Sequence, residues 1–240
     1  MKSSEKLPEK LMYTSRLKKI NNKYYFILPH RNEVNKTQRG NNKCTSIDPG
    51  SNNFLSGYDP EGLNYIIGKG SIEKIARLLH CLYKLESKKK KAKTHKKRYA
   101  YGKALKQHRE KIKNLIDDLH KKSIKWLCSN YNVILISRLN FHNMKKLNKK
   151  SKNKLKTYRH CEFLNKLITK AKEYSNCKVI EVNEAYTTQT CCNCGFEKKD
   201  VGISKLFKCD KCNTELLRDL NGACNIFIRY LSQRVKIHFE

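Results

Sequence analysis

The chain has 240 residues, of which 53 are Lys or Arg and 21 are Asp or Glu, so its formal net charge is +32 at pH 7. No segment approaches the roughly 18 consecutive apolar residues of a membrane-spanning helix, and the charged first ten residues lack the apolar run of a signal peptide. The composition therefore excludes a membrane protein and predicts an intracellular one with at most two domains.

The large positive charge predicts a polyanionic partner, because compaction has to work against the self-repulsion of the chain. Nucleic acid fits this partner better than a membrane surface, since the charge is spread along the chain and no basic amphipathic helix carries a Trp/Phe/Leu face. Any single lysine can instead be a solvated surface residue that contacts no nucleic acid.

The first half of the chain predicts strands followed by helices. Residues 23–28 (KYYFIL) and 44–47 (CTSI) have strand composition, and 53–58 and 64–67 flank the turn-forming sequence Asp-Pro-Glu-Gly. From residue 72 the apolar spacing changes to three and four, which predicts a long helical hairpin over residues 72–127. We expect one apolar face to comprise Ile72, Ile75, Ala76, Leu79, Leu82 and Tyr83.

The tip of this hairpin is strongly basic, and it is a candidate phosphate-binding surface. A solvated charge run without a partner is the alternative. The residues concerned are Lys88, Lys89, Lys90, Lys91, Lys93, Lys96, Lys97 and Arg98.

The second half predicts a strand at 133–136, apolar enough to be buried on both faces, then a Lys/Asn-rich loop at 144–157 whose residues from 145 onward are further candidate phosphate contacts. A helix through residues 163–174 and a strand at 178–182 follow. The terminal segment, 219–231, places Leu220, Ala223, Cys224, Phe227 and Leu231 on one helical face. This order of elements predicts a mixed α/β domain.

Four of the eleven cysteines have the spacing of a zinc site. Cys191-x-x-Cys194 and Cys209-x-x-Cys212 are separated by 14 residues, the pattern of a zinc ribbon. Four thiolates leave no open coordination position, so the predicted Zn²⁺ is structural. Cys192 is taken as a bystander, although ligand exchange with Cys191 stays open. The cysteines scattered singly are expected to be small buried hydrophobes in a reducing compartment.

Carboxylates just beyond predicted core strands are notable in so basic a chain. Asp48 follows residues 44–47, Glu184 follows residues 178–182, and Asp219 opens the terminal helix. Converging carboxylates are what two-metal phosphodiester hydrolysis requires. Each also has an ordinary explanation: turn chemistry for Asp48, solvation for Glu184, and helix capping for Asp219.

Three motifs, in this order, resemble the transposon-encoded TnpB (OrfB) proteins and their eukaryotic and viral Fanzor relatives, which are also related to type V CRISPR nucleases. They are Ile-Asp-Pro-Gly at 47–50, Tyr-Thr-Thr-Gln-Thr-Cys-Cys-Asn-Cys-Gly at 186–195, and Arg-Asp-Leu-Asn-Gly-Ala-Cys-Asn-Ile at 218–226. The resemblance covers about residues 23–231 and includes the basic hairpin.

The resemblance implies a RuvC nuclease core of the RNase H type at 43–186 and 218–240, interrupted by a zinc ribbon at 187–217 that contacts target nucleic acid. It also implies RNA-guided, Mg²⁺-dependent cleavage of DNA. Asp48 and Asp219 match the first and last catalytic carboxylates of the family. Glu184 matches the relocated glutamate of Fanzor-like members, since Ser137 stands where most TnpB proteins carry their glutamate.

Length is a further departure from the family. The resemblance implies that residues 1–42 are a remnant of the wedge domain, with 23–28 as its last strand. Guide RNA is then a further candidate partner beside DNA. The alternatives are a catalytically inactive, truncated zinc-ribbon protein that still binds nucleic acid, and a regulator that occupies the guide or target of a full-length relative.

Overall fold

The computed structural model describes residues 6–20, 23–29, 43–139, 149–183, 187–199 and 204–237. The chain divides into two compact units, residues 1–35 and 36–240. The functional residues predicted from the sequence all belong to the second unit.

The first unit contains a two-stranded antiparallel hairpin. Strand β1 (Arg16–Ile20) pairs with β2 (Lys23–Ile27), with Arg16 opposite Ile27 and Ile20 opposite Lys23. All ten residues are exposed. The sequence predicted β2 and missed β1, because three of the five β1 residues are basic and lack the β-branched or aromatic composition of a strand.

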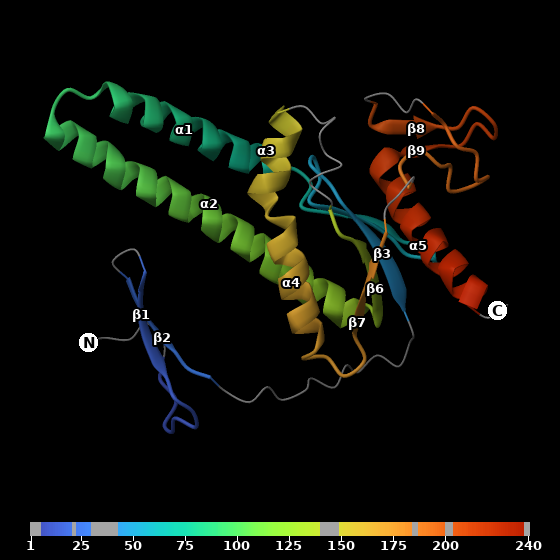
Figure 1. Cartoon of the computed structure of the whole chain (residues 1–240), viewed down its shortest axis with the longest axis horizontal. Coiled ribbons are helices and arrows are strands. Elements are labelled where there is room, and N and C mark those ends of the chain that lie inside the picture. The colour runs from blue at the N-terminus through green and yellow to red at the C-terminus, as the bar shows by residue number, and fades with distance from the viewer. Residues whose placement is uncertain are drawn as a thin grey trace. The chain divides into compact units, whose positions relative to one another are not determined.

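The second unit is built on a mixed five-stranded sheet (Figure 1). Its strands are β3 (Cys44–Pro49), β4 (Leu55–Tyr58), β5 (Asn64–Ile67), β6 (Val133–Ser137) and β7 (Lys178–Val182). The spatial order is β5-β4-β3-β6-β7, in which β3 pairs with β6 and β6 with β7 in parallel, whereas the β3–β4 and β4–β5 pairs are antiparallel. The carboxyl ends of β3, β6 and β7 therefore lie at one edge of the sheet, in agreement with the predicted mixed α/β class.

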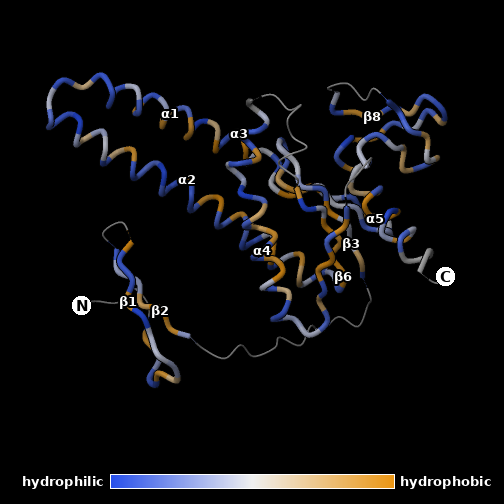
Figure 2. The backbone as a smooth tube through the Cα atoms, viewed as in Figure 1, coloured by the Kyte–Doolittle hydropathy of each residue, from blue (hydrophilic) through white to orange (hydrophobic). Residues whose placement is uncertain are grey.

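Helices cover both faces of this sheet. They are α1 (Ser71–Lys91), α2 (His95–Asn130), α3 (Lys149–Tyr158), α4 (His160–Ala171) and α5 (Arg218–Ile237). Helix α5 packs on one face through Ile226 against Leu135 and Val182. The larger core on the opposite face joins the sheet to α1, α2 and α4, and the hydrophobic residues of β3 and β6 stand out in Figure 2. Each fully buried Leu or Ile of this core contributes about 1.5–3 kcal/mol of transfer free energy.

The predicted helical hairpin is present as α1 and α2, which run side by side in Figure 1. Ile72, Ile75 and Leu82 are buried as expected, whereas Ala76 and Tyr83 are exposed. The buried stripe is narrower than the sequence suggests, because α2 is the main packing partner of α1.

Part of the predicted loop at 144–157 is helical, which corrects that prediction. Helix α3 begins at Lys149, and it is anchored by the buried residues Leu155 and Tyr158, three positions apart. The Tyr158 hydroxyl lies 2.9 Å from the Ser71 hydroxyl. Residues 140–148 lie outside the described part of the chain.

The last elements are two short strands and α5. Strand β8 (Leu206–Lys208) pairs antiparallel with β9 (Glu215–Leu217), and α5 begins directly after β9. Leu231, expected on the buried face of α5, is 45% exposed, because the sheet contacts of this helix are made by residues nearer its start, such as Ala223 and Ile226.

All eleven cysteines lie among the described residues, and none forms a disulfide. Cys128 and Cys224 are buried, but Cys81 and Cys161 are exposed, so the prediction of small buried hydrophobes fails for these two. In the described helices, no segment has the length and apolar character needed to cross a lipid bilayer.

Candidate metal centres

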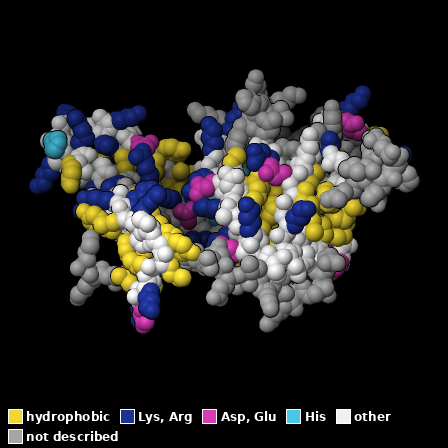
Figure 3. All heavy atoms as spheres, turned by 60° about the horizontal axis from the view of Figure 1, so that its bottom comes forward, with side chains coloured by type: hydrophobic (Ala, Val, Ile, Leu, Met, Phe, Trp, Pro, Cys, Tyr) yellow, Lys and Arg dark blue, Asp and Glu magenta, His cyan; other side chains and the backbone are white. Residues whose placement is uncertain are grey.

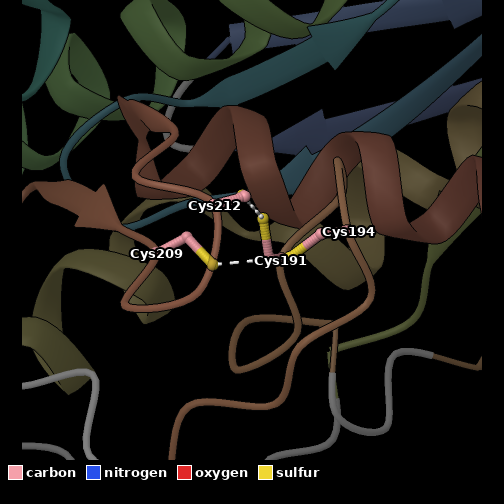
Figure 4. Close-up of side chains that lie close together, drawn as sticks. All are labelled: Cys191, Cys194, Cys209 and Cys212. Carbon is pink, nitrogen blue, oxygen red and sulfur yellow. Dashed lines mark hydrogen bonds between the residues drawn. The ribbon is translucent and has the colours of Figure 1, made fainter.

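The four cysteines of the predicted zinc site converge on one point. Figure 4 shows the side chains of Cys191, Cys194, Cys209 and Cys212 directed toward one another, with all four sulfurs within 4.8 Å of each other. The Sγ atoms of Cys191 and Cys212 are 3.7 Å apart, and those of Cys194 and Cys209 are 3.5 Å apart. Sulfurs at about 2.3 Å from a tetrahedral Zn²⁺ would be separated by roughly 3.8 Å, so the cluster fits that ion.

The two Cys-x-x-Cys segments have the same backbone structure. The first cysteine of each, Cys191 or Cys209, donates its N–H to the carbonyl five residues later, at Phe196 or Thr214. Each also accepts at its own carbonyl from the N–H four residues later, at Gly195 or Asn213.

Gly195 and Asn213 both have positive φ, 72° and 55°. Glycine and asparagine are the residues that adopt this conformation most readily. These two residues therefore allow the turn through which each cysteine pair presents both sulfurs to one side.

Local interactions shift the pKa values of the cluster's thiols in opposite directions. The Thr214 hydroxyl lies 3.1 Å from the Cys212 sulfur, and hydrogen bonds from Thr214 lower the pKa of this thiol to about 6. Burial raises the pKa of Cys191. A bound cation would favour deprotonation of both, because thiolates are the ligating form.

A second cluster forms where β3 meets the first turn of α5. Asp48 lies inside β3, which continues through Pro49, and not in a turn after the strand as expected. Asp219 is the second residue of α5, so it lies inside the helix and is not its N-cap. A carboxylate in the first turn is favoured by the positive end of the helix dipole.

Two glycines lie beside these carboxylates. A β-carbon on Gly222 of α5 would stand 2.7 Å from Oδ2 of Asp48, and one on Gly50 would stand 3.6 Å from Oδ2 of Asp219. Each aspartate thus lies against the glycine that belongs to the other aspartate's segment. The structure therefore brings Asp48 and Asp219 together, although 171 positions separate them in the sequence.

Glu184, the third predicted carboxylate, lies outside the described residues. Strand β7, which precedes it, ends at Val182 beside the ends of β6 and β3. In the parallel register Val182 lies opposite Ser137 of β6, and Ile136 of β6 lies opposite Ile47 of β3. Ser137 is 2% exposed, and its hydroxyl has no hydrogen-bond partner among the described residues. The position at which the resemblance to TnpB proteins would lead one to expect a glutamate thus holds a buried, neutral side chain.

Two asparagines of α5 were missed by the sequence analysis. Asn221 accepts from the Cys192 N–H at 3.0 Å and donates to the Thr190 carbonyl at 2.7 Å. Asn225, one turn later, donates to the carbonyls of Thr187 and Thr190 at 2.8 and 2.6 Å. Asparagine is a poor helix former, so two of them at i and i+4 are a signal that sequence reasoning can use.

Comparison with known proteins agrees with these features. Residues 160–226 match a family model described as the Cas12f1-like TNB domain. TnpB-like protein L79 of Acanthamoeba polyphaga mimivirus is 29% identical over 220 residues, which cover 85% of this chain and 40% of that protein. The putative transposase R186 of the same virus is 31% identical over 208 residues, covering 80% of this chain and 40% of its own length. The chain is similar to TnpB-like proteins.

Solved structures share the fold of this TnpB-like chain. This chain matches a chain in the structure of a Cas12f1–sgRNA–target DNA complex with a TM-score of 0.52 and 19% sequence identity. The match covers 88% of this chain and 54% of the Cas12f1 chain. A CRISPR-Cas12f ternary complex gives a TM-score of 0.56 and 21% identity, over 85% and 41%. This chain spans about 40% of the length of the curated relatives that it matches.

The basic tip of the TnpB-like chain is exposed. All eight residues proposed for phosphate contact have exposed side chains. Arg98 also donates to the Ala92 carbonyl at 3.2 Å, and therefore helps to close the turn between α1 and α2. Figure 3 shows Lys and Arg side chains spread over the face in view.

Proposed function

We propose that residues 43–186 and 218–240 form a RuvC-type, RNase H-like nuclease core that cleaves DNA. Asp48, Glu184 and Asp219 are the proposed metal-binding and catalytic carboxylates. The single observation that carries the proposal is the approach of Asp48 and Asp219 at the carboxyl edge of the sheet, on residues of two motifs that resemble those of TnpB proteins.

The residues present fit Mg²⁺. Carboxylate oxygens are among its preferred protein ligands, and β3 and α5 bring the carboxylates of Asp48 and Asp219 to the same place. When bound, Mg²⁺ would supply an activated water and stabilise the leaving oxygen of the phosphodiester. The protein's own part is to hold two negative charges close together on a strand and a helix that pack on each other.

We assign Glu184 the third ligand position because it follows β7 by two residues. Ile180 and Val182 of β7 face α5, as Leu135 of β6 does. Glu184 lies outside the described residues, so its assignment rests on its resemblance to the relocated glutamate of Fanzor-like members. Ser137 carries no charge and does not replace it.

The cysteine cluster is proposed to be a structural zinc ribbon at residues 187–217, close to bound nucleic acid. Its support is the tetrahedral separation of the sulfurs and the repeated turn around each cysteine pair. Thiolate ligands require reduced cysteines, which supports a reducing compartment.

DNA and guide RNA are the proposed partners. The Cas12f structures that share this fold are complexes with an sgRNA and target DNA, or a ternary complex. The exposed lysines of the hairpin tip are proposed to bind phosphate, which adds affinity without base recognition. Residues 1–42 are proposed to be part of a wedge-type domain.

The test is cleavage of single-stranded and duplex DNA by the purified chain with Mg²⁺, with and without RNA that co-purifies. We expect each of three substitutions to lower the rate of cleavage by more than about 10²-fold: Asp48→Ala, Glu184→Gln and Asp219→Asn. Asp118→Asn is the matched control, because Asp118 is an exposed aspartate of α2 paired with Lys122. Cleavage that is equal in all variants would overturn the assignment.

A second candidate is nucleic-acid binding without cleavage. The net charge of +32 and the exposed basic tip favour it independently of the carboxylates. Metal-independent, salt-sensitive binding of DNA without any cut product would select this function.

A further inference from the structure

The short turn that follows Asp48 is fixed from inside the protein. Gly50 donates its N–H to the Phe54 carbonyl at 3.2 Å, which closes the turn between β3 and β4. Phe54 is fully buried. A β-carbon on Gly50 would stand 2.9 Å from the Asn53 carbonyl oxygen and 3.6 Å from Oδ2 of Asp219, so a shift of this glycine would disturb the place where the two aspartates meet.

His160, the first residue of α4, binds this turn. Its side chain is buried, and its Nε2 lies 3.0 Å from the Gly50 carbonyl oxygen. Because a carbonyl oxygen only accepts, Nε2 must carry the proton. Nδ1 is buried without a hydrogen-bond partner in the part of the chain that the structure describes, so the imidazole is neutral.

His120 of α2 provides an internal comparison. Both imidazoles stack on the Phe54 ring, His160 with centroids 5.1 Å apart and His120 with centroids 5.3 Å apart. The Nε2 of His120, however, lies 2.8 Å from the Tyr158 carbonyl, at the end of α3. The two histidines share the same aromatic partner, but His160 alone of the pair binds backbone beside Asp48.

We infer that His160 is a positioning residue for the Asp48–Asp219 centre, acting through its hydrogen bond to the Gly50 carbonyl. The inference rests on the proposed function, because it concerns how that metal-binding centre is held in place. His160 does not touch the carboxylates. It fixes the backbone two residues after Asp48, at the point where Gly50 faces Asp219.

The experiment compares three variants of the full, zinc-loaded chain. His160→Phe keeps a ring for stacking on Phe54 and removes the donor, whereas His160→Gln restores an N–H near the position of Nε2. His120→Phe is the matched control, since it removes the other buried histidine of the stack and its bond to Tyr158. Calorimetry with Mn²⁺ measures binding of this ion at pH 7.5. Hydrogen exchange of the same zinc-loaded chain, without added Mn²⁺, measures protection of the Gly50 amide.

We expect His160→Phe to weaken Mn²⁺ binding by about tenfold or more, and to raise exchange at the Gly50 amide. His160→Gln should recover most of the affinity. His120→Phe should lower the melting temperature without either change, which separates positioning from general stability.

Two results would overturn the inference in different ways. If the wild type binds Mn²⁺, Asp48→Ala does not, and His160→Phe binds like the wild type, the inference fails and the proposed function stands. If the wild type binds no Mn²⁺ at this site, the proposed metal centre fails, and the role of His160 fails with it.

Discussion

Oδ2 of Asp48 lies 2.7 Å from the point that a β-carbon on Gly222 would occupy, so β3 and α5 meet at a carboxylate and a glycine. Glycine inside a helix is about 1 kcal/mol less favourable than alanine. The close approach of a charged group from the sheet explains why glycine is needed at this position.

Gly222→Ala should therefore affect the stability of α5 and the geometry of the Asp48–Asp219 site in opposite directions. The substitution favours the helix by about 1 kcal/mol, but the new methyl group displaces the Asp48 carboxylate, whose end can move. We expect the melting temperature to change little and Mn²⁺ affinity, measured by calorimetry, to fall by at least about tenfold.

Gly102→Ala in α2 is the control for this prediction. A β-carbon there meets nothing closer than the flexible Lys89 ammonium, at 3.7 Å. It should raise stability by about 0.5–1 kcal/mol and leave metal binding unchanged. Unaltered Mn²⁺ binding by Gly222→Ala would contradict the proposed position of the metal.

Removal of zinc should unfold the cysteine-rich segment. Structural zinc contributes on the order of 10–16 kcal/mol of apparent binding free energy in small modules. We expect one Zn²⁺ per chain by mass spectrometry, and its loss with strong chelators or in Cys194→Ser should raise hydrogen exchange across residues 187–199 and 204–217. Cys81→Ser, which changes an exposed cysteine of α1, should retain the ion. A zinc-free wild type with the same protection would disprove the site.

Asn225→Leu should loosen the attachment of the cysteine-rich segment to α5. The substitution removes the hydrogen bonds from Asn225 to the carbonyls of Thr187 and Thr190, while Asn221 still donates to the Thr190 carbonyl. Loss of the bond to the buried Thr187 should lower the free energy of unfolding by about 1–3 kcal/mol, measured by denaturant unfolding. Asn130→Ala removes an exposed asparagine bonded to the Trp126 carbonyl, and should cost less than about 0.5 kcal/mol. Equal losses in the two variants would mean that Asn225 does not anchor the segment.

Stability should fall as the solution becomes acidic. Burial lowers the pKa of His160 from 6.5 to about 4, and burial also lowers the pKa of His120. The unfolded chain therefore binds more protons than the folded chain between pH 6.5 and about 4, so stability is complete above this window and is lost as pH falls through it. The charged groups that act on His120 are Lys166, Arg159 and Glu162.

Denaturant unfolding at several pH values tests this dependence. His160→Gln removes one titrating group, so its stability should decline less steeply between pH 6.5 and 4 than that of the wild type. His80→Gln, at an exposed position of α1, should follow the wild-type curve. A slope that His160→Gln leaves unchanged would assign the acid sensitivity to other groups.

Phosphate binding by the hairpin tip should appear as salt dependence. Replacing Lys88, Lys90 and Lys91 by Gln should weaken DNA binding and reduce the slope of log K against log salt concentration by about 0.9 for each phosphate that the tip no longer neutralises. The matched control replaces Lys121, Lys122 and Lys125, three exposed lysines near the other end of α2. Equal slopes for the two triple variants, measured by fluorescence anisotropy, would show that net charge and not the tip determines affinity.

Sequence patterns predicted the elements whose information is local. The spacing of apolar residues along α1 and α2, the apolar run of β6 and the two Cys-x-x-Cys segments each repeat within a few residues, so they could be recognised without knowledge of any contact. Helix α3 was mistaken for a loop because its many lysines conceal the pattern of the two residues that anchor it, Leu155 and Tyr158.

The amino-acid sequence alone thus predicted the mixed α/β class, the cysteine cluster, and Asp48 and Asp219 as two candidate site residues. Only the tertiary structure decided that Asp48 and Asp219 adjoin each other's glycines, that Asn221 and Asn225 hold the cysteine-rich segment, and that His160 reaches Gly50. The reason is physical: these contacts join residues tens to more than a hundred positions apart, and the packing of α5 and α4 on opposite faces of one sheet brings them together.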